Sequence, residues 1–203
     1  MFEAIPNGTP RGAVVVCHGG EGLTLHEREV VGRLAAMGFA AVAPDLYGAP
    51  PSIEMIRALI GEPTELRRRV IMVVDAMRVH GRVAVIGHCF GGTAALEVAR
   101  AGADLACVVA FHGGLTAPQP GAIRTRVLAC CGAADSFCPP EQRSAFEDEM
   151  TRAGASWQLH VYGGAKHGFT VRAIDRPGCA YDERVDRASW AAMTALLDET
   201  IAP

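Results

Sequence analysis

Short apolar runs alternate with helical patterns along the 203-residue chain, and this alternation limits the possible folds more than any other feature. A short continuous apolar run is typical of a strand that is buried on both faces. The expected strands are Ala13–Cys17, Phe39–Ala43, Val83–Ile86, Ala106–Phe111, Val127–Cys131 and Gln158–Tyr162. Strands separated by helices in this way form a mostly parallel sheet with helices on both faces. The pattern therefore predicts an α/β fold.

The expected helices lie between these strands. Apolar Val30, Val31 and Leu34 at helical spacing predict a helix over Glu27–Met37, which Gly38 ends. The other expected helices are Thr64–Arg78, Gly91–Arg100, Pro139–Ala153 and Arg184–Ile201. The remaining long stretches, expected to be loops, are Tyr47–Ser52, Gly113–Arg124 and Gly163–Cys179. Because no repeat or linker interrupts the pattern, residues 1–203 are expected to form a single domain.

Charge and composition argue against several classes of protein. The formal net charge is -3, from 19 basic and 22 acidic side chains, which does not favour nucleic-acid binding. No apolar run reaches the roughly 18 residues that span a bilayer, and residues 1–10 do not resemble a secretory signal. The seven cysteines lie mostly in apolar runs, which is typical of reduced thiols. We expect a cytoplasmic protein without membrane contact. The basic run Arg67–Arg69 is expected to form a solvated face of its helix.

The hexapeptide Gly87-His88-Cys89-Phe90-Gly91-Gly92 follows an expected strand and opens an expected helix. This is the pattern of a nucleophile elbow, with cysteine in place of the more usual serine. The tight turn leaves room only for glycine at positions 87 and 91. It also places Cys89 at a helix N-terminus, where the helix dipole favours a thiolate. The alternative is a glycine-rich turn that holds a buried cysteine.

An activated cysteine needs a base, and the base needs an acid that orients it. In an α/β-hydrolase arrangement the acid and then the histidine follow the nucleophile along the chain. Asp135 comes just after one expected strand, and His167 follows the last expected strand. Both therefore belong to the sheet edge that carries Cys89. The alternatives are a turn or helix-cap aspartate and a solvated loop histidine.

Other histidines and cysteines are weaker candidates. His18 and His112 end expected strands at the same edge, where they either shape a pocket or hold the backbone. Cys130, Cys131 and Cys138 are close in sequence, but adjacent residues on a strand point to opposite faces. No spacing typical of metal ligands occurs. The sequence therefore predicts neither a metal site nor another cofactor.

These motifs resemble the dienelactone hydrolase family within the α/β-hydrolase superfamily, and the resemblance covers nearly the whole chain. The stretches that carry it are His18–Leu23, Pro44–Gly48, Gly87–Gly92, Phe111–Gly113, Gly132–Asp135, His167–Thr170 and Asp186–Trp190. The resemblance implies an α/β-hydrolase fold and a Cys89–His167–Asp135 triad that cleaves an ester or lactone through a thioester. It also implies an oxyanion hole formed by the backbone N–H groups of Gly20 and Phe90.

The chain departs from the family pattern at two places. The family usually has a glutamate that supports the thiol at the position of Gly19. Glu21 is the candidate replacement, and the alternative is a salt-bridged loop glutamate. An arginine that the family uses to hold a substrate carboxylate is also missing after the Asp-Leu-Tyr motif. The candidate substrate-binding residues are Tyr47, His112 and Arg172.

The leading hypothesis is a cysteine-dependent hydrolase of small esters or lactones, a monomer by default. The second hypothesis is a hydrolase-fold binding protein with an inactive site, prompted by the missing glutamate. The third is a thiol redox protein, prompted by the seven cysteines, although no CxxC motif supports it.

Overall fold

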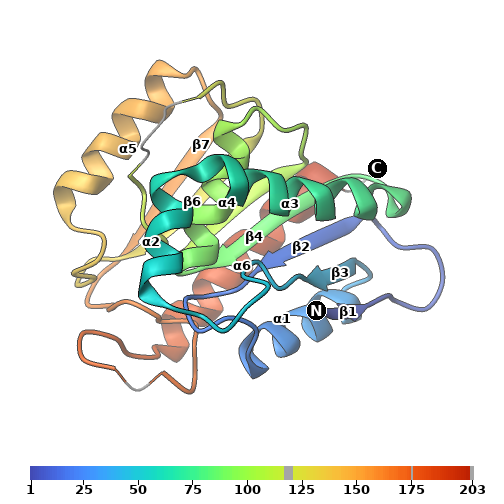
Figure 1. Cartoon of the computed structure of the whole chain (residues 1–203), viewed down its shortest axis with the longest axis horizontal. Coiled ribbons are helices and arrows are strands. Elements are labelled where there is room, and N and C mark those ends of the chain that lie inside the picture. Colours follow the sequence, from blue (N-terminus) through green and yellow to red (C-terminus); the bar gives the residue numbers. More distant parts are fainter. Residues whose placement is uncertain (117–120, 175, 202–203) are drawn as a thin grey trace.

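The computed structural model describes residues 1–116, 121–174 and 176–201. Residues 117–120, 175 and 202–203, which fall in two expected loops and at the end of the expected domain, lie outside the described residues. Within the described part, the strands are β1 (Phe2–Ala4), β2 (Ala13–Cys17), β3 (Ala40–Ala43), β4 (Val83–His88), β5 (Cys107–Phe111), β6 (Arg126–Gly132) and β7 (Trp157–Tyr162). They form one sheet in the order β1-β3-β2-β4-β5-β6-β7, shown in Figure 1. Only β1 pairs antiparallel, and it pairs with β3.

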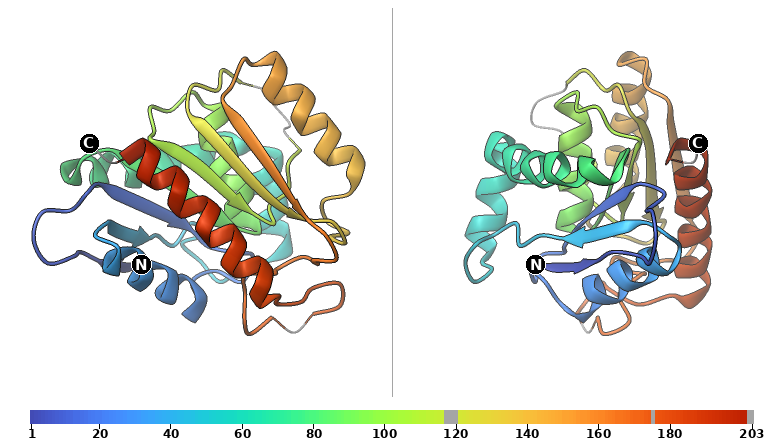
Figure 2. Two further views of the ribbon diagram at one scale, coloured as in Figure 1. Left: turned by 180° about the vertical axis from the view of Figure 1, so that it is seen from behind. Right: turned by 90° about the vertical axis from the view of Figure 1, so that its right-hand side faces the viewer.

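Helices cover both faces of this sheet, as Figure 2 shows. They are α1 (Leu25–Ala36), α2 (Ile53–Gly61), α3 (Pro63–Met77), α4 (Phe90–Arg100), α5 (Pro140–Arg152) and α6 (Glu183–Ile201), and a short 3₁₀ helix, η1 (Arg78–His80), follows α3. The helices α1 and α6 cover one face, and α3, α4 and α5 cover the other. This three-layer arrangement confirms the expected α/β class.

The central strands form because both of their faces are buried. In β2, Val14 and Val16 pack beneath α1 and α6, whereas Val15 packs beneath α3 and α4. All three side chains are completely buried, and full burial of a valine contributes roughly 1.5–3 kcal/mol. Two apolar layers therefore fix the sheet, and this explains why the strands are continuous apolar runs in the sequence.

Two elements were not expected from the sequence. The strand β1 has three residues, which is too short for a periodic pattern, and it exists because it pairs with β3. The helix α2 follows directly after the expected loop Tyr47–Ser52. Its N-cap is Ser52, whose hydroxyl accepts a hydrogen bond from the Met55 N–H at 3.1 Å. The apolar side of α2 packs on the core through Met55, Ile56, Leu59 and Ile60, a helical spacing that we did not single out from the sequence.

The expected solvated face on α3 is wrong for two of its three arginines. Arg67 donates to the buried carboxylate of Glu97 with Nε at 3.1 Å and Nη2 at 2.7 Å. Arg69 donates to the backbone carbonyls of Leu46 and Tyr47, at 2.5 and 2.9 Å. These arginines therefore tie α3 to α4 and to the loop that follows β3.

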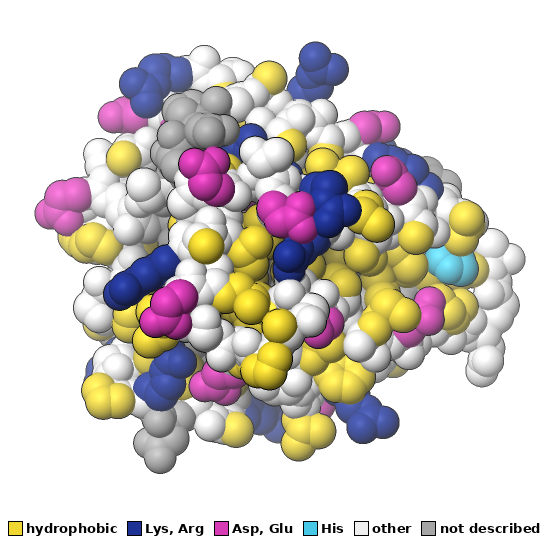
Figure 3. Space-filling view, in the orientation of Figure 1, with side chains coloured by type: hydrophobic (Ala, Val, Ile, Leu, Met, Phe, Trp, Pro, Cys, Tyr) yellow, Lys and Arg dark blue, Asp and Glu magenta, His cyan; other side chains and the backbone are white. Residues whose placement is uncertain are grey.

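On one face of the molecule, charged side chains of both signs are mixed (Figure 3). On the face over α2 and α3, basic and acidic side chains are interspersed with apolar ones (Figure 3). Within the described residues, no helix is both long enough and apolar enough to cross a bilayer.

The parallel strands bring distant segments to one edge. In the register of the sheet, Cys17 pairs with Gly87, Phe111 with Cys130, and Gly132 with Tyr162. The carboxyl ends of β2, β4, β5, β6 and β7 therefore lie side by side. In open α/β sheets this edge is where ligands bind.

Candidate active site

The turn from β4 into α4 is strained at Cys89, the N-cap of α4. Its φ is 55° and its ψ is -118°, a conformation that side chains rarely adopt and that costs roughly 1–3 kcal/mol. A Cβ atom on Gly87 would overlap the carbonyl of Gly91, and one on Gly91 would overlap the carbonyl of Cys17. Close backbone contacts thus explain both glycines of the motif, as the sequence predicts.

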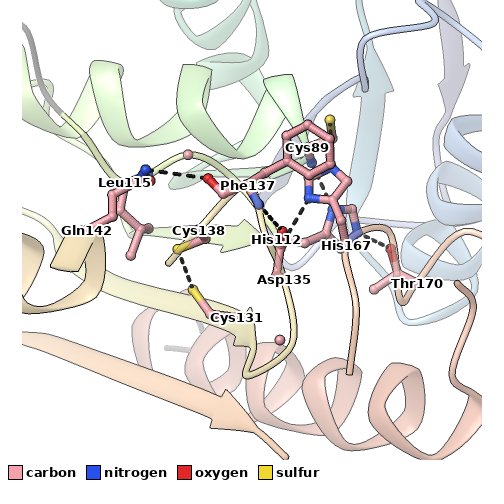
Figure 4. A network of polar contacts seen from close by, with 12 residues as sticks. Cys89, His112, Leu115, Cys131, Asp135, Phe137, Cys138, Gln142, His167 and Thr170 are labelled. Carbon is pink, nitrogen blue, oxygen red and sulfur yellow. Dashed lines mark hydrogen bonds and ion pairs between the residues drawn. The ribbon is translucent and has the colours of Figure 1, made fainter. Parts of the chain in front are cut away.

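The three candidate catalytic side chains lie in one line of contacts (Figure 4). The Nε2 atom of His167 is 3.1 Å from the Cys89 sulfur, and its Nδ1 atom is 2.9 Å from Oδ2 of Asp135. The other carboxylate oxygen of Asp135 accepts the backbone N–H of Phe137 at 2.8 Å. The carboxylate therefore holds the imidazole with Nδ1–H toward Asp135 and with Nε2 toward the sulfur.

These contacts shift the acidity of both reacting groups. Burial lowers the pKa of His167, but the hydrogen bonds and negative charges of Asp135 and Cys89 outweigh it and raise this pKa to about 10. Burial raises the pKa of the Cys89 thiol, but the His167 ring lowers it to below its ordinary value. In contrast, burial raises the pKa of Cys17 and of Cys130 to about 12. The arrangement therefore favours a thiolate–imidazolium pair at Cys89.

Two backbone N–H groups also face the Cys89 sulfur. They belong to Gly20, in the loop after β2, and to Phe90, at the start of α4, and both lower the pKa of the thiol. They come from different strand ends, so they approach the sulfur from separate segments. Donors placed in this way can bind an oxygen that becomes negatively charged next to the sulfur.

His18 and Tyr47 hold the loop that contains Gly20. The Nε2 atom of His18 accepts the N–H of Leu46 at 2.9 Å, and its Nδ1–H donates to the carbonyl of Gly19 at 2.8 Å. The hydroxyl of Tyr47 donates to the carbonyl of Gly20 at 3.3 Å. Tyr47 is only 3% exposed and is not among the described residues that border the cavity beside Cys89, so its contact with substrate stays a prediction. Its hydroxyl holds the loop.

His112 supports the elbow from the end of β5. Its Nδ1 atom accepts the N–H of Cys89 at 3.2 Å, and its Nε2–H donates to the hydroxyl of Thr170 at 2.8 Å, as Figure 4 shows. Burial holds the pKa of His112 well below its ordinary value, so the ring is neutral. This ring also borders the cavity beside the sulfur.

A cavity of about 360 Å³ opens beside Cys89. Its walls are the first turn of α1, the elbow, and the loop that follows His167. Arg172 lies on this loop, is exposed and borders the cavity. Pockets for small molecules commonly have volumes of about 300–1,000 Å³, so this cavity fits a small ligand.

The expected support of the thiol by Glu21 is wrong. Its side chain is 66% exposed, and its carboxylate pairs with Arg176 at 3.6 Å, on the outer part of the cavity wall. The buried acid beside Gly19 is Glu27, which we did not single out from the sequence. The spacing of Thr24 and Glu27 matches a capping box, and this pattern could have identified it.

Within the described residues, no group of three or more His, Cys, Asp or Glu side chains is arranged to hold a metal ion.

Comparisons with known proteins agree on one family. The model of the dienelactone hydrolase family matches residues 2–201. A putative carboxymethylenebutenolidase from Salmonella typhimurium is 30% identical over 202 residues, which cover 85% of this chain and 71% of the relative. The hydrolase pyvD from Aspergillus violaceofuscus is 27% identical over 163 residues, 74% of this chain and 66% of the relative, so the chain spans just under two thirds of its length.

Solved structures give the same result. A dienelactone hydrolase-like promiscuous phosphotriesterase from metagenomic libraries has a TM-score of 0.89 and 37% identity, covering 96% of this chain and 88% of its own. A putative dienelactone hydrolase from Klebsiella pneumoniae has a TM-score of 0.83 at 23% identity, covering 97% and 91%. The expected α/β-hydrolase fold is confirmed.

Proposed function

Because this chain belongs to the dienelactone hydrolase family, and is therefore a hydrolase acting on ester bonds, we propose that it cleaves small esters or lactones with Cys89 as the nucleophile. The observation that carries the proposal is the line of contacts from the Cys89 sulfur through His167 to Asp135. The sulfur also borders a cavity large enough for a small substrate.

The first chemical step is attack of the Cys89 thiolate on the ester carbonyl. His167 has taken the thiol proton, and Asp135 stabilises the resulting imidazolium through the 2.9 Å contact. The carbonyl oxygen becomes an oxyanion, which the N–H groups of Gly20 and Phe90 stabilise. Each such donor typically contributes about 3–4 kcal/mol to the transition state.

The second step breaks the bond to the alcohol. The oxyanion re-forms the carbonyl, the alkoxide leaves, and it takes the proton from Nε2 of His167. The acyl group remains on Cys89 as a thioester. The neutral His167 then removes a proton from water, the hydroxide attacks the thioester, and the sulfur leaves and recovers the thiolate–imidazolium pair. Because thiolate leaves the tetrahedral state more readily than an amine, we expect little peptidase activity.

The test replaces the proposed nucleophile and compares it with another thiol. Cys89→Ala should lower kcat for p-nitrophenyl acetate and for γ-butyrolactone by about 10³-fold or more. The matched control is Cys179→Ala, since Cys179 is the one other cysteine that is not fully buried. This control should keep kcat within about threefold of the wild type. Retained turnover in Cys89→Ala would rule out Cys89 as the nucleophile.

Mass spectrometry separates this proposal from its two competitors. Acid quenching during turnover of p-nitrophenyl acetate should trap an acetyl group on Cys89. An inactive binding protein would show no acetylation and no preferential alkylation of Cys89 by iodoacetamide. A redox protein would form a disulfide through Cys89. In this structure the Cys89 sulfur contacts His167, and the thiol–thiol contact at 3.8 Å joins two other cysteines, Cys131 and Cys138.

A further inference from the structure

The loop after β2 contains two consecutive glycines, Gly19 and Gly20, so no Cβ atom restricts the peptide that joins them and hydrogen bonds must set its orientation. In a trans peptide the C=O and the N–H point in opposite directions. The carbonyl of Gly19 accepts hydrogen bonds from Nδ1–H of His18 at 2.8 Å and from the N–H of Gly22 at 3.1 Å. These bonds turn the carbonyl away from the elbow, and the N–H of Gly20 consequently faces the Cys89 sulfur.

The amide on the other side of Gly19 is held by Glu27. One carboxylate oxygen, Oε1, accepts the N–H of Gly19 at 3.3 Å. The other, Oε2, accepts the N–H and the hydroxyl of Thr24 at 2.8 and 2.7 Å. Glu27 is 3% exposed and borders the same cavity as Cys89. Its carboxylate thus joins the N-cap of α1 to the glycine pair.

The contact with Gly19 goes beyond what a helix cap requires. A capping box needs the glutamate to accept a donor of the N-cap residue, which Oε2 does at Thr24. Oε1 is not needed for the cap, and it reaches eight positions back along the chain. From this geometry we infer that Glu27 is a positioning residue for the oxyanion hole, because it fixes the backbone that presents the N–H of Gly20. The inference rests on the proposed function.

The substitution Glu27→Gln separates the two contacts. A glutamine has one acceptor oxygen and one amide NH₂ group, so it cannot accept donors on both sides. The oxygen should keep the shorter contacts with Thr24, and the NH₂ group should then face the N–H of Gly19. Gly19 loses its acceptor, and the Gly20 N–H loses its fixed direction. The helix cap survives, since glutamine also serves in capping boxes.

The experiment measures kcat and KM for p-nitrophenyl acetate in the full-length wild type, in Glu27→Gln and in the control Thr24→Ala. The control removes the hydroxyl that caps α1 but leaves Glu27 free to accept from Gly19. We expect Glu27→Gln to lower kcat at least about tenfold and to keep KM within about threefold of the wild type. The oxyanion forms in the transition state and not in the bound substrate, so its stabilisation affects kcat. Thr24→Ala should lower Tm but keep kcat within about twofold.

A second measurement distinguishes positioning from general damage. Iodoacetamide alkylates Cys89 without forming an oxyanion, so the limiting rate at high pH, where the thiol is fully ionised, should stay within about twofold in Glu27→Gln. A parallel loss of alkylation and of kcat, or equal loss of kcat in Thr24→Ala, would overturn the inference in favour of a structural role. Wild-type kcat in Glu27→Gln would overturn it as well.

Two further variants complete the test. If Glu27→Gln does not fold, Glu27→Asp carries the same expectations, because its shorter side chain cannot bridge Thr24 and Gly19. Cys89→Ala is assayed alongside. Turnover in that variant would defeat the proposed function and this inference with it. An inactive Cys89→Ala together with wild-type kcat in Glu27→Gln would defeat only the role of Glu27.

Discussion

Among the described residues, a cluster of buried polar side chains around Arg100 contrasts with the cluster around Cys89, because only in the first does every charged group have a partner within the protein. In the first cluster, between α3, α4 and α5, Arg100 donates to Glu97 at 2.9 Å and to Glu149 at 2.7 and 2.8 Å. Its remaining contact is to the carbonyl of Leu115 at 2.7 Å, and Glu97 is also held by Arg67. Both carboxylates and the guanidinium are satisfied within the protein.

The second cluster, around Cys89, is satisfied on one side only. Asp135 and the Nδ1 side of His167 are held by the protein, while the Cys89 sulfur borders the cavity. In the Arg100 cluster every charged group is paired within the protein, so the cluster contributes to the fold. In the Cys89 cluster one group faces the cavity, where it can react with a substrate. Substitutions in the two clusters should therefore change different quantities: the free energy of unfolding in the first, and the reaction rate in the second.

The largest expected effect is on catalysis, from Asp135→Asn. An amide keeps the shape of the side chain and an acceptor for Phe137, but no longer stabilises the imidazolium, so kcat should fall by about 10³-fold or more. Tm should change little. Steady-state kinetics with p-nitrophenyl acetate measures this, with Asp148→Asn on the exposed face of α5 as the control. A kcat within tenfold of the wild type would contradict the assigned role.

The next effect is on stability, from Arg100→Met. Removal of this cation leaves Glu149 without its buried partner, and breaking such a pair costs about 3–5 kcal/mol of the free energy of unfolding. Urea denaturation measures the loss. The kcat of the folded fraction should remain at the wild-type value. A tenfold drop in kcat would show that the two clusters are not independent.

The third prediction concerns the pH dependence of Cys89. Its pKa lies below the ordinary thiol value, so the rate of alkylation by iodoacetamide should rise at a lower pH than for a free thiol. In His167→Asn, burial acts without the imidazolium, and the rise should move to higher pH. Mass spectrometry of Cys89 across a pH series measures both curves. Superimposable curves would mean that His167 does not control the thiol.

The smallest expected effect comes from an exposed ion pair. Arg126 contacts Glu199 at 2.8 Å, but the two side chains are 41% and 57% exposed. Because solvent screens such a pair, Arg126→Gln should change the free energy of unfolding by less than about 1 kcal/mol. It is the matched control for Arg100→Met in the same urea series. If Arg126→Gln and Arg100→Met lowered the free energy of unfolding equally, burial would not determine how much each ion pair contributes to stability.

The part of the fold that could be predicted from sequence is the part with continuous apolar runs. The six longer strands and five of the helices lie where the pattern places them, because both faces of each central strand are buried. The strand β1 was missed because it has three residues, which leave no periodic pattern in a sequence, and it forms by pairing with β3. The helix α2 was missed although Met55, Ile56, Leu59 and Ile60 have helical spacing and Ser52 is a typical N-cap residue.

The candidate site was predictable to the extent that it depends on strand ends. Cys89, Asp135 and His167 each follow a parallel strand, so their meeting at one edge follows from topology. The contacts that Glu27 and Tyr47 make with Gly19 and Gly20 were not predictable in this way, because they are made to backbone atoms. Almost every residue has the same backbone N–H and C=O groups, so the residue type at the accepting or donating position does not reveal such a hydrogen bond.

The contact between Cys89 and His167 joins residues 78 positions apart, which follow strands β4 and β7, and β5 and β6 lie between these strands in the sheet. The native geometry of this contact therefore requires the pairings β4–β5, β5–β6 and β6–β7. During refolding from denaturant, the return of esterase activity should therefore lag behind the circular dichroism of the helices. The return of turnover therefore reports the rate at which the long-range strand pairings form, which the circular dichroism of the helices does not report.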